Sequence, residues 1–457
     1  MSPTASAAAE FPAELPSGMP ATAPDPYMPG HGTEVYRVSR YELELDYRLS
    51  SNHLAGRARL HAVARRQSSA IVLDLTGLRA TKVLMPGRKV RKFNQQAERL
   101  VVVPEPALLP GDEFILDIRY EGNPAPRRGL WGEVGWEELS DGVLVAGQPN
   151  GASSWFPCND HPQDKASYRI AVTTDANYRA VCNGVLVSHQ ARSSRETWIY
   201  EQSEPMASYL ATVQIGRYEL LQLNPDRAEG DVAQAVAVPV ELSADARAGL
   251  ARQHQMMRTF TNCFGPYPFP RYTVVVTEDE LEIPLEAQSL SIFGRNHLAQ
   301  DWESQRLIAH ELSHQWFGNS LTAASWKDIW LHEGFACYAE WIWSEEARIM
   351  TVADRARAAW RMLNREDQDL LVGDPGPELM FDDRVYKRGA LALHAVRVRC
   401  GDLAFFALLH DWTGSHRYGS VTTEEFILAA HRVTGMDAEA VLHPWLYQEA
   451  LPPLPAG

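Results

Sequence analysis

The first half of the chain alternates apolar and polar residues, a period-two pattern typical of strands with one buried face. The longest run is YELELDYRL, at residues 41–49. Pro, Gly and Asn turns separate further β-like runs at residues 58–62, 70–75, 100–103, 114–120, 168–173 and 196–200. The pattern predicts an antiparallel β domain over residues 35–222.

The periodicity changes after a polar, turn-rich stretch, QLNPDRAEGDVAQAVA, at residues 222–237. A helix is expected from a cap at Ser243 to a stop at Gly265, followed by a strand at residues 272–277. Further helical segments are predicted at residues 328–347, 352–369, 385–399, 403–412, 423–433 and 438–447. The sequence therefore predicts an α+β multidomain chain whose second domain, residues 223–457, is mostly helical.

The first 34 residues are rich in Pro and Ala and lack both the early basic cluster and the compact apolar stretch of a secretion signal. We expect residues 1–34 to form a flexible leader, and we expect a cytoplasmic location. No apolar run approaches the roughly 18 residues that a membrane-spanning helix needs.

The net charge is −15, from 43 basic and 58 acidic residues, and no basic run is present. This balance argues against nucleic acid or an anionic membrane as a partner. The cysteines are odd in number, widely spaced and free of any C-x-x-C pair, so reduced thiols are expected at Cys158, Cys182, Cys263, Cys337 and Cys400. The sequence does not indicate an oligomeric state.

The stretch IAHELSHQWFGN, residues 308–319, contains two histidines four positions apart. On a helix, His310 and His314 would project side by side and could hold one metal ion. Asp301 is a plausible cap for this helix, and Gly318 with Asn319 is a natural stop.

A catalytic zinc ion commonly takes three protein ligands and leaves one position for water. Glu333, in DIWLHEGFACYAEW, follows His314 by nineteen positions in a second predicted helix. We therefore predict one Zn²⁺ ion held by His310, His314 and Glu333. Glu311, adjacent to His310, is the expected general base that takes a proton from the metal-bound water.

HELSHQWFGN followed by WLHEGFA resembles the motifs of the aminopeptidase N-like zinc metallopeptidases, a gluzincin group that also contains a leukotriene epoxide hydrolase. The resemblance includes residues 147–168, 205–218 and 385–397, and so covers almost everything from residue 29 onwards. It implies a thermolysin-like catalytic domain, a zinc cofactor and removal of the N-terminal residue from peptides that have a free N-terminus.

The resemblance also implies roles for residues outside the zinc motif. Tyr386, in the segment YKRGA, matches the tyrosine that donates to the oxyanion in this family. Glu286 interrupts an apolar, strand-like run, where an acid needs a partner. It stands at the glutamate of the family's exopeptidase motif, usually Gly-Ala-Met-Glu-Asn, where it would bind the free α-ammonium of the substrate. Gln148 matches a family glutamine, and Asn150 replaces a frequent second acid; both would orient that amine.

The sequence leaves alternatives open. An endopeptidase is disfavoured by Glu286, an epoxide hydrolase could share the site, and a peptide-binding protein without turnover is disfavoured because the expected site residues are intact. Glu340 and Asp328 are both candidate hydrogen-bond partners of a ligand histidine. Larger relatives carry helical domains beyond the segment HPWLYQEALPPLP, so a more open cleft is expected here.

Overall fold

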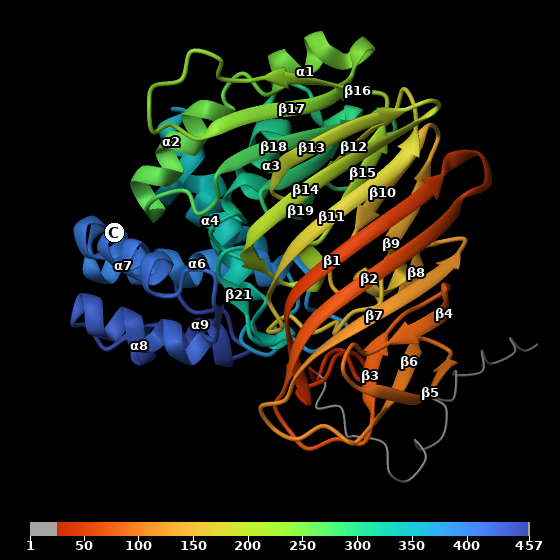
Figure 1. Cartoon of the computed structure of the whole chain (residues 1–457). Coiled ribbons are helices and arrows are strands. Elements are labelled where there is room, and N and C mark those ends of the chain that lie inside the picture. The colour runs from red at the N-terminus through yellow and green to blue at the C-terminus, as the bar shows by residue number, and fades with distance from the viewer. Residues whose placement is uncertain (1–24, 456–457) are drawn as a thin grey trace, which may run out of the picture.

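The computed structural model describes residues 25–455 (Figure 1). Most of the expected leader, residues 1–24, lies outside the described residues. The remainder, residues 25–34, packs onto the protein: Tyr27 and Met28 are buried, and Asp25 accepts a 2.8 Å hydrogen bond from the backbone N–H of Trp326. The start of the described chain is thus attached to the second domain.

The largest element of the N-terminal domain is a seven-stranded sheet in the order β13-β14-β11-β1-β2-β7-β4. Its strands are β1 (Tyr36–Arg48), β2 (His53–Ala64), β4 (Arg79–Leu84), β7 (Glu113–Gly122), β11 (Ala166–Asp175), β13 (Val185–Arg192) and β14 (Arg195–Met206). The antiparallel prediction fails for one pair, because β1 and β11 run parallel, with Leu43 opposite Ile170. The long excursion of residues 49–165 provides the crossover that a parallel pair requires.

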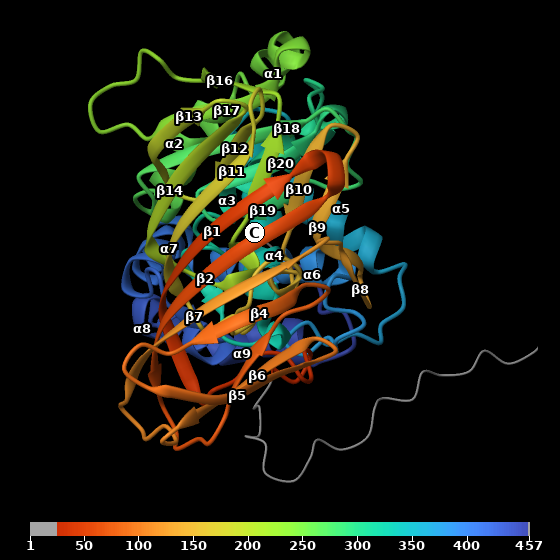
Figure 2. The ribbon, with the colours of Figure 1, turned by 45° about the vertical axis from the view of Figure 1, so that its right-hand side comes forward.

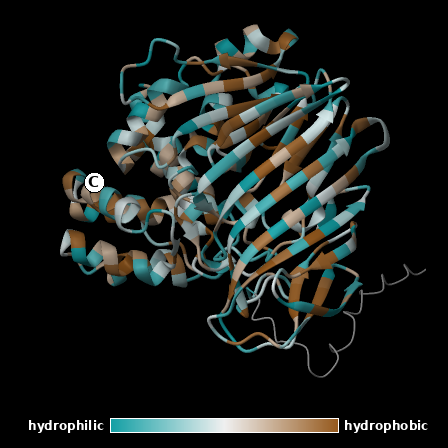
Figure 3. Ribbon diagram, viewed as in Figure 1, coloured by the Kyte–Doolittle hydropathy of each residue, from teal (hydrophilic) through white to brown (hydrophobic). Residues whose placement is uncertain are grey.

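The predicted alternation is visible along β1. Leu43 and Leu45 are buried, whereas Glu42 and Glu44 lie on the opposite face. Figure 3 shows the resulting bands of apolar and polar residues along the long strands. Ion pairs cover the outer face, including a 3.1 Å contact between Arg59 and Glu42. The inner face supplies the apolar core of this domain.

Two smaller sheets complete the N-terminal domain. One has the order β12-β15-β10-β9-β8, formed by β8 (Arg127–Gly129), β9 (Gly132–Leu139), β10 (Gly142–Ala146), β12 (Arg179–Cys182) and β15 (Val213–Gly216). The other has the order β3-β6-β5, formed by β3 (Ile71–Asp74), β5 (Lys89–Gln96) and β6 (Arg99–Glu105). Figure 2 shows this three-stranded sheet at one end of the long sheet, near β4.

The second domain begins with a mixed sheet in the order β16-β17-β18-β20-β19. Its strands are β16 (Tyr218–Gln222), β17 (Ala233–Pro239), β18 (Arg271–Thr277), β19 (Leu285–Ala287) and β20 (Leu290–Gly294), and a separate pair is formed by β21 (Thr322–Ala323) and β22 (Ser420–Val421). Because β16 pairs with β17, residues 218–222 share a sheet with the second domain. The boundary after residue 222 remains a proposal, and this pairing favours a limit a few residues earlier.

Helices form the rest of the second domain: α1 (Ser243–Gly249), α2 (Gln253–Phe264), α3 (Trp302–Ser313), α4 (Trp330–Glu346), α5 (Val352–Leu363), α6 (Asp383–Cys400), α7 (Asp402–Ser415), α8 (Thr423–Thr434) and α9 (Ala438–Tyr447). The single helix expected after Ser243 is two helices, and the Ser243 hydroxyl donates to Glu219 instead of capping. The predicted α+β class, with a β-rich domain followed by a helical one, is confirmed.

Two glycines allow α4 and α6 to cross closely. A Cβ atom added to Gly334 would lie 3.0 Å from the backbone of Gly389, so a side chain at this crossing would push the helices apart. The crossing sets α6 beside the helix that carries Glu333. Within residues 25–455, no helix is long and apolar enough to cross a membrane.

Candidate metal centre and active site

Helix α3 presents the two motif histidines together. Its first turn is capped by Asp301, whose side chain accepts a 2.9 Å hydrogen bond from the backbone N–H of Ser304. His310 lies in the last turn of α3, and His314 directly follows the end of the helix. Both are buried, and their ring centroids are 4.8 Å apart. The helix therefore orients both imidazoles toward one point.

Helix α4 brings the predicted third ligand to that point. The Glu333 carboxylate oxygen Oε2 lies 3.3 Å from Nε2 of His310 and 3.5 Å from Nε2 of His314. The donor atoms of the three side chains all lie within 4.8 Å of one another. Two imidazole nitrogens and one carboxylate oxygen are a donor set that zinc accepts in open, catalytic sites.

The opposite ring nitrogens have their own partners. Nδ1 of His314 lies 3.0 Å from the carbonyl oxygen of Phe317, which can only accept, so this nitrogen carries the hydrogen. Nδ1 of His310 lies 2.8 Å from Glu340. Both contacts leave Nε2 free to bind a metal. The other candidate partner, Asp328, instead accepts a 2.6 Å hydrogen bond from the Thr423 hydroxyl.

The charges of the pocket favour a bound cation. Burial lowers the pKa of His314, but Glu333 and Glu286 outweigh this effect and raise it to about 9. Burial likewise opposes the positive form of His310, yet Glu333 and Glu340 raise its pKa to about 10. A pocket that stabilises positive charge on both imidazoles would also stabilise a divalent cation between them, so the residues present fit zinc.

Glu311 points into the same pocket. It is buried, and among residues 25–455 its oxygen Oε2 has no hydrogen-bond partner. Glu311, Glu286 and His314 form a second group whose ligand atoms lie within 4.8 Å of one another. Burial raises the pKa of Glu311 to about 8, against the opposing effect of both histidines. A free, buried carboxylate beside a metal site is suited to exchange a proton with water.

Tyr386 lies in the first turn of α6, which Asp382 caps. Its ring stacks on that of His310, with centroids 6.0 Å apart and an interplanar angle of 19°. Burial, followed by the charge of Glu333, raises the pKa of Tyr386 well above its ordinary value. The phenol therefore stays protonated and can donate a hydrogen bond at the metal centre.

The predicted amine-binding residues come from both domains. Glu286 lies on β19, opposite Ser291 of β20. Nε2 of Gln148, from the loop after β10, donates a 2.6 Å hydrogen bond to Oε1 of Glu286. Asn150 is also buried, but its contact is through its backbone carbonyl, which accepts a 3.1 Å hydrogen bond from Arg127. The structure therefore joins Glu286 to Gln148, and it does not join the Asn150 side chain to them.

Two supporting residues were missed by the sequence interpretation. Gln315 donates to the Ala287 carbonyl at 3.1 Å and accepts from the Ser289 backbone N–H at 2.8 Å. Asn319 also donates to the Ala287 carbonyl, at 3.0 Å. These amides connect β19, which carries Glu286, to the segment that follows α3. Their signal in the sequence was two amide side chains inside an otherwise apolar motif, HQWFGN.

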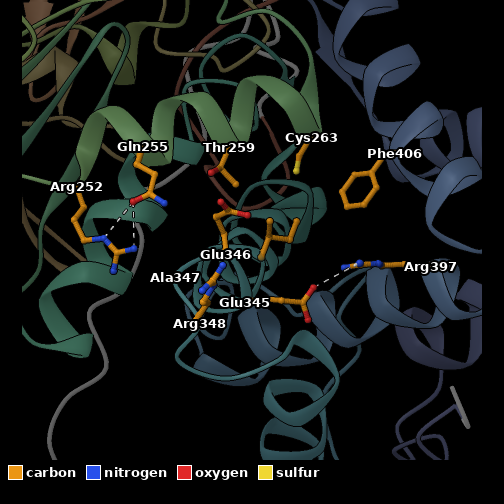
Figure 4. Close-up of a pocket in the computed structure, with 11 residues that line it drawn as sticks. Arg252, Gln255, Thr259, Cys263, Glu345, Glu346, Ala347, Arg348, Arg397 and Phe406 are labelled. Carbon is orange, nitrogen blue, oxygen red and sulfur yellow. Dashed lines mark hydrogen bonds and ion pairs between the residues drawn. The ribbon is translucent and has the colours of Figure 1, made fainter.

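A separate surface cavity lies between α2, α4, α6 and α7 (Figure 4). Its volume is about 540 Å³, and none of the metal-centre residues lines it. Basic and acidic groups alternate around it; Arg397, for example, lies 4.0 Å from Glu345 and 2.8 Å from Asp402.

Two family models match the chain. The peptidase M1 N-terminal domain matches residues 38–210, and the peptidase family M1 domain matches residues 249–445. The two matches fall on the β-rich domain and on the domain that contains the metal centre.

Similar proteins of known name are aminopeptidases and related factors. A leucyl aminopeptidase from Saccharolobus solfataricus is 23% identical over 91% of this chain and 54% of its own length. The tricorn protease-interacting factor F2 from Thermoplasma acidophilum is 24% identical, again over 91% of this chain and 54% of its own length. The chain thus spans about half the length of these relatives.

Solved structures match over their whole length. An M1 zinc metallopeptidase from Deinococcus radiodurans is 31% identical, with a TM-score of 0.86, and the match covers 94% of this chain and 98% of that one. A mutant of that metallopeptidase, bound to a Tyr-Ser-Ala substrate, matches equally well at 30% identity. These matches identify Zn²⁺ as the cofactor of the metal centre. The chain belongs to the M1 family of zinc metallopeptidases.

Proposed function

We propose that this chain is a zinc-dependent aminopeptidase that hydrolyses the first peptide bond of peptides with a free N-terminus. The observation that carries the proposal is the position of Glu286, whose carboxylate lies within 4.8 Å of ligand atoms of Glu311 and His314. A carboxylate so close to the reacting centre can bind an α-ammonium, and only a substrate's first residue carries that group beside the scissile bond.

Both domains contribute to amine binding in this proposal. Gln148 holds one oxygen of Glu286 at 2.6 Å and so fixes the orientation of the carboxylate. We propose that the side-chain amide of Asn150, in the same loop, also orients the substrate's amine by its dipole. Burial raises the pKa of Glu286, while the charge of His314 lowers it. An arriving ammonium would further favour the ionised carboxylate.

The proposed chemistry uses the residues around the metal centre. His310, His314 and Glu333 would hold the zinc ion, which would make a water molecule more acidic and polarise the peptide carbonyl. Glu311 takes the proton from the water and returns it to the departing amine. Tyr386 donates a hydrogen bond to the developing oxyanion.

Comparison supports the substrate class. The Deinococcus radiodurans metallopeptidase mutant was solved with a Tyr-Ser-Ala substrate. Two further similar structures are of a two-domain M1 zinc metallopeptidase mutant, one bound to L-tryptophan and the other to L-arginine. A tripeptide and free amino acids all carry an α-ammonium. We propose peptides with an unblocked N-terminus as the substrates of this chain as well.

A panel of fluorogenic aminoacyl amides tests the proposal. We expect hydrolysis that stops after treatment with a chelator and returns when Zn²⁺ is restored. The Glu311→Gln variant should bind zinc but turn over none of the amides. Zinc-loaded wild-type protein that cleaves no amide in the panel would refute the proposal.

We also propose a cytoplasmic location. All five cysteines are free, and three of them, Cys158, Cys182 and Cys337, are buried. Reduced, unpaired thiols are typical of proteins kept in a reducing compartment. Fractionation of cells that express the full chain would test this location.

A further inference from the structure

A lysine of the N-terminal domain reaches the turn that follows the zinc helix. The Lys165 ammonium donates hydrogen bonds to the carbonyl oxygens of Asn319 at 3.0 Å, Ser320 at 2.8 Å and Gly419 at 3.2 Å. Lys165 directly precedes β11, whereas all three acceptors belong to the second domain. One ammonium thus joins two loops of the second domain to the N-terminal domain.

A tyrosine makes a neighbouring contact with the same turn. The buried Tyr209 hydroxyl donates to the Gly318 carbonyl at 3.2 Å. Three consecutive carbonyl groups, those of Gly318, Asn319 and Ser320, therefore accept hydrogen bonds from side chains of the N-terminal domain. Gly318 has a φ of +121°, a value that favours glycine and that this sharp turn requires.

The turn in question also holds a zinc ligand. The Phe317 carbonyl accepts the Nδ1–H of His314 at 3.0 Å, and the Asn319 backbone N–H donates to the His314 carbonyl, also at 3.0 Å. Backbone hydrogen bonds close this turn, from the Gly318 N–H to the Leu321 carbonyl at 2.7 Å and from the Asn319 N–H to the His314 carbonyl, so its planar peptide groups cannot rotate independently. The direction of the Phe317 carbonyl therefore depends on where the next carbonyls in the turn point.

An ammonium held by neutral carbonyls alone is an uncommon arrangement. Burial lowers the pKa of Lys165 to about 7, and within residues 25–455 no acid offsets this effect. A neutral residue would pack here without the cost of desolvating a charge, so packing alone does not explain the lysine. Its contacts with the carbonyls beside His314 indicate that it holds this turn in place.

We propose that Lys165 is a positioning residue, which fixes the turn at residues 317–320 and thereby orients the zinc ligand His314. The N-terminal domain then controls zinc retention in addition to supplying Gln148. Removing the ammonium takes a hydrogen-bond donor away from the buried carbonyls of Asn319 and Ser320, so the turn loses this restraint and can relax. The Phe317 carbonyl then loses its alignment with Nδ1 of His314, and zinc binding weakens.

The test measures zinc loss to an excess of chelator at pH 6, without any peptide substrate. Loss of the direct hydrogen-bond partner of a zinc ligand lowers metal affinity by about 10- to 100-fold. Lys165 contacts the turn that follows His314 and not the ligand's direct partner, so its effect should be smaller. We expect Lys165→Met to release zinc about 10-fold faster than wild type, near the lower end of that range. Lys92→Met, at an exposed lysine on β5, is the matched control and should match wild type.

A second readout separates positioning from a loss of folding. As the pH rises through the pKa of Lys165, wild type loses its ammonium, so the difference from Lys165→Met should shrink between pH 6 and pH 8.5. Burial lowers the pKa of His332, which senses the Lys165 charge, to about 3, so this ring stays neutral over that range. Far-UV circular dichroism and urea unfolding establish that each variant is folded.

Lys165→Gln, which keeps a neutral donor, covers the case in which Lys165→Met does not fold; it should release zinc at an intermediate rate. Wild-type zinc retention in a folded Lys165→Met or Lys165→Gln protein would overturn the proposal. A difference from wild type that does not change with pH would also overturn it. Because no peptide is cleaved in these assays, their outcome is independent of the proposed aminopeptidase activity.

Discussion

Gln148 and Glu286 are 138 positions apart in the sequence, yet their side chains are joined by a 2.6 Å hydrogen bond. The amide comes from the N-terminal domain, and the carboxylate comes from the second domain, beside the zinc ligands. The contact fixes the orientation of a carboxylate beside the metal centre. An extended peptide chain passing through this point would meet an unpaired anion, whereas a free N-terminus would meet its counterion.

The first prediction concerns this pair. Glu286→Gln keeps the shape of the side chain and removes its charge. A hydrogen bond to a charged group contributes about 1.5–3 kcal/mol, so kcat/KM for a free-amine substrate should fall by roughly 10- to 150-fold. Gln148→Ala leaves the charge of Glu286 in place, so it should lower kcat/KM by less than Glu286→Gln does. Steady-state kinetics would show this order, with Glu282→Gln on the exposed loop as the unaffected control.

The second prediction concerns the contact between Glu340 and His310. Glu340→Gln weakens the acceptor at Nδ1 of His310, so zinc affinity should fall by about 10- to 100-fold. Competition with a chromogenic chelator measures the change. Glu346→Gln, an exposed acid at the end of the same helix, should bind zinc like wild type. Equal affinities of the two variants would remove Glu340 from the account.

The third prediction concerns Tyr386. Because the hydroxyl would act only on the developing oxyanion, Tyr386→Phe should lose about 2–4 kcal/mol of transition-state stabilisation, or roughly 30- to 900-fold in kcat. Zinc content, measured by atomic emission, should not change. Near-normal kcat in this variant would assign the stacked ring a structural role only.

The fourth prediction concerns pH and a buried acid in the N-terminal domain. Asp164 accepts hydrogen bonds from the Val38 backbone N–H at 3.1 Å and from the Asn159 side chain at 2.5 Å. Burial raises the pKa of Asp164 from 3.8 to about 7, against the lowering effect of these hydrogen bonds. The folded protein therefore keeps this proton between pH 4 and pH 7, whereas the unfolded chain releases it.

Raising the pH across that window should destabilise the fold, because the folded state binds the extra proton. The contribution of Asp164 is on the order of 4 kcal/mol and is lost by pH 7. Asp164→Asn removes this dependence, so wild type should lose stability relative to the variant between pH 4.5 and pH 7.5. Urea unfolding at several pH values measures the difference. A difference that is constant, or that grows with pH, would contradict the prediction.

Local patterns in the sequence were sufficient to predict much of the fold. The alternation in YELELDYRL predicted β1, because one face of that strand packs on the core and the other carries ion pairs. Two residues four apart on α3 are neighbours by helix geometry alone, so His310 and His314 could be paired before the structure was known. The parallel pairing of β1 with β11 depends on contacts between distant segments, which no local pattern records.

The zinc ligands were easier to predict than the residues that position them. Glu333 follows His314 by nineteen positions, across β21 and into the first turn of α4, so one short stretch of sequence includes both. Glu340 and Asp328 could not be separated as partners of a histidine, because the choice depends on how α4 lies against α3. Lys165 gave no signal as a lone lysine, because its acceptors are backbone carbonyls that exist in any sequence.

The central claim is that the site requires an unblocked N-terminus. Its most direct test uses zinc-loaded protein with the tripeptide Tyr-Ser-Ala in two forms, free and acetylated at the amino group, and follows the products by mass spectrometry. We predict release of tyrosine from the free peptide only, abolished by a chelator. Cleavage of the acetylated peptide at a similar rate would contradict the account and would indicate an endopeptidase.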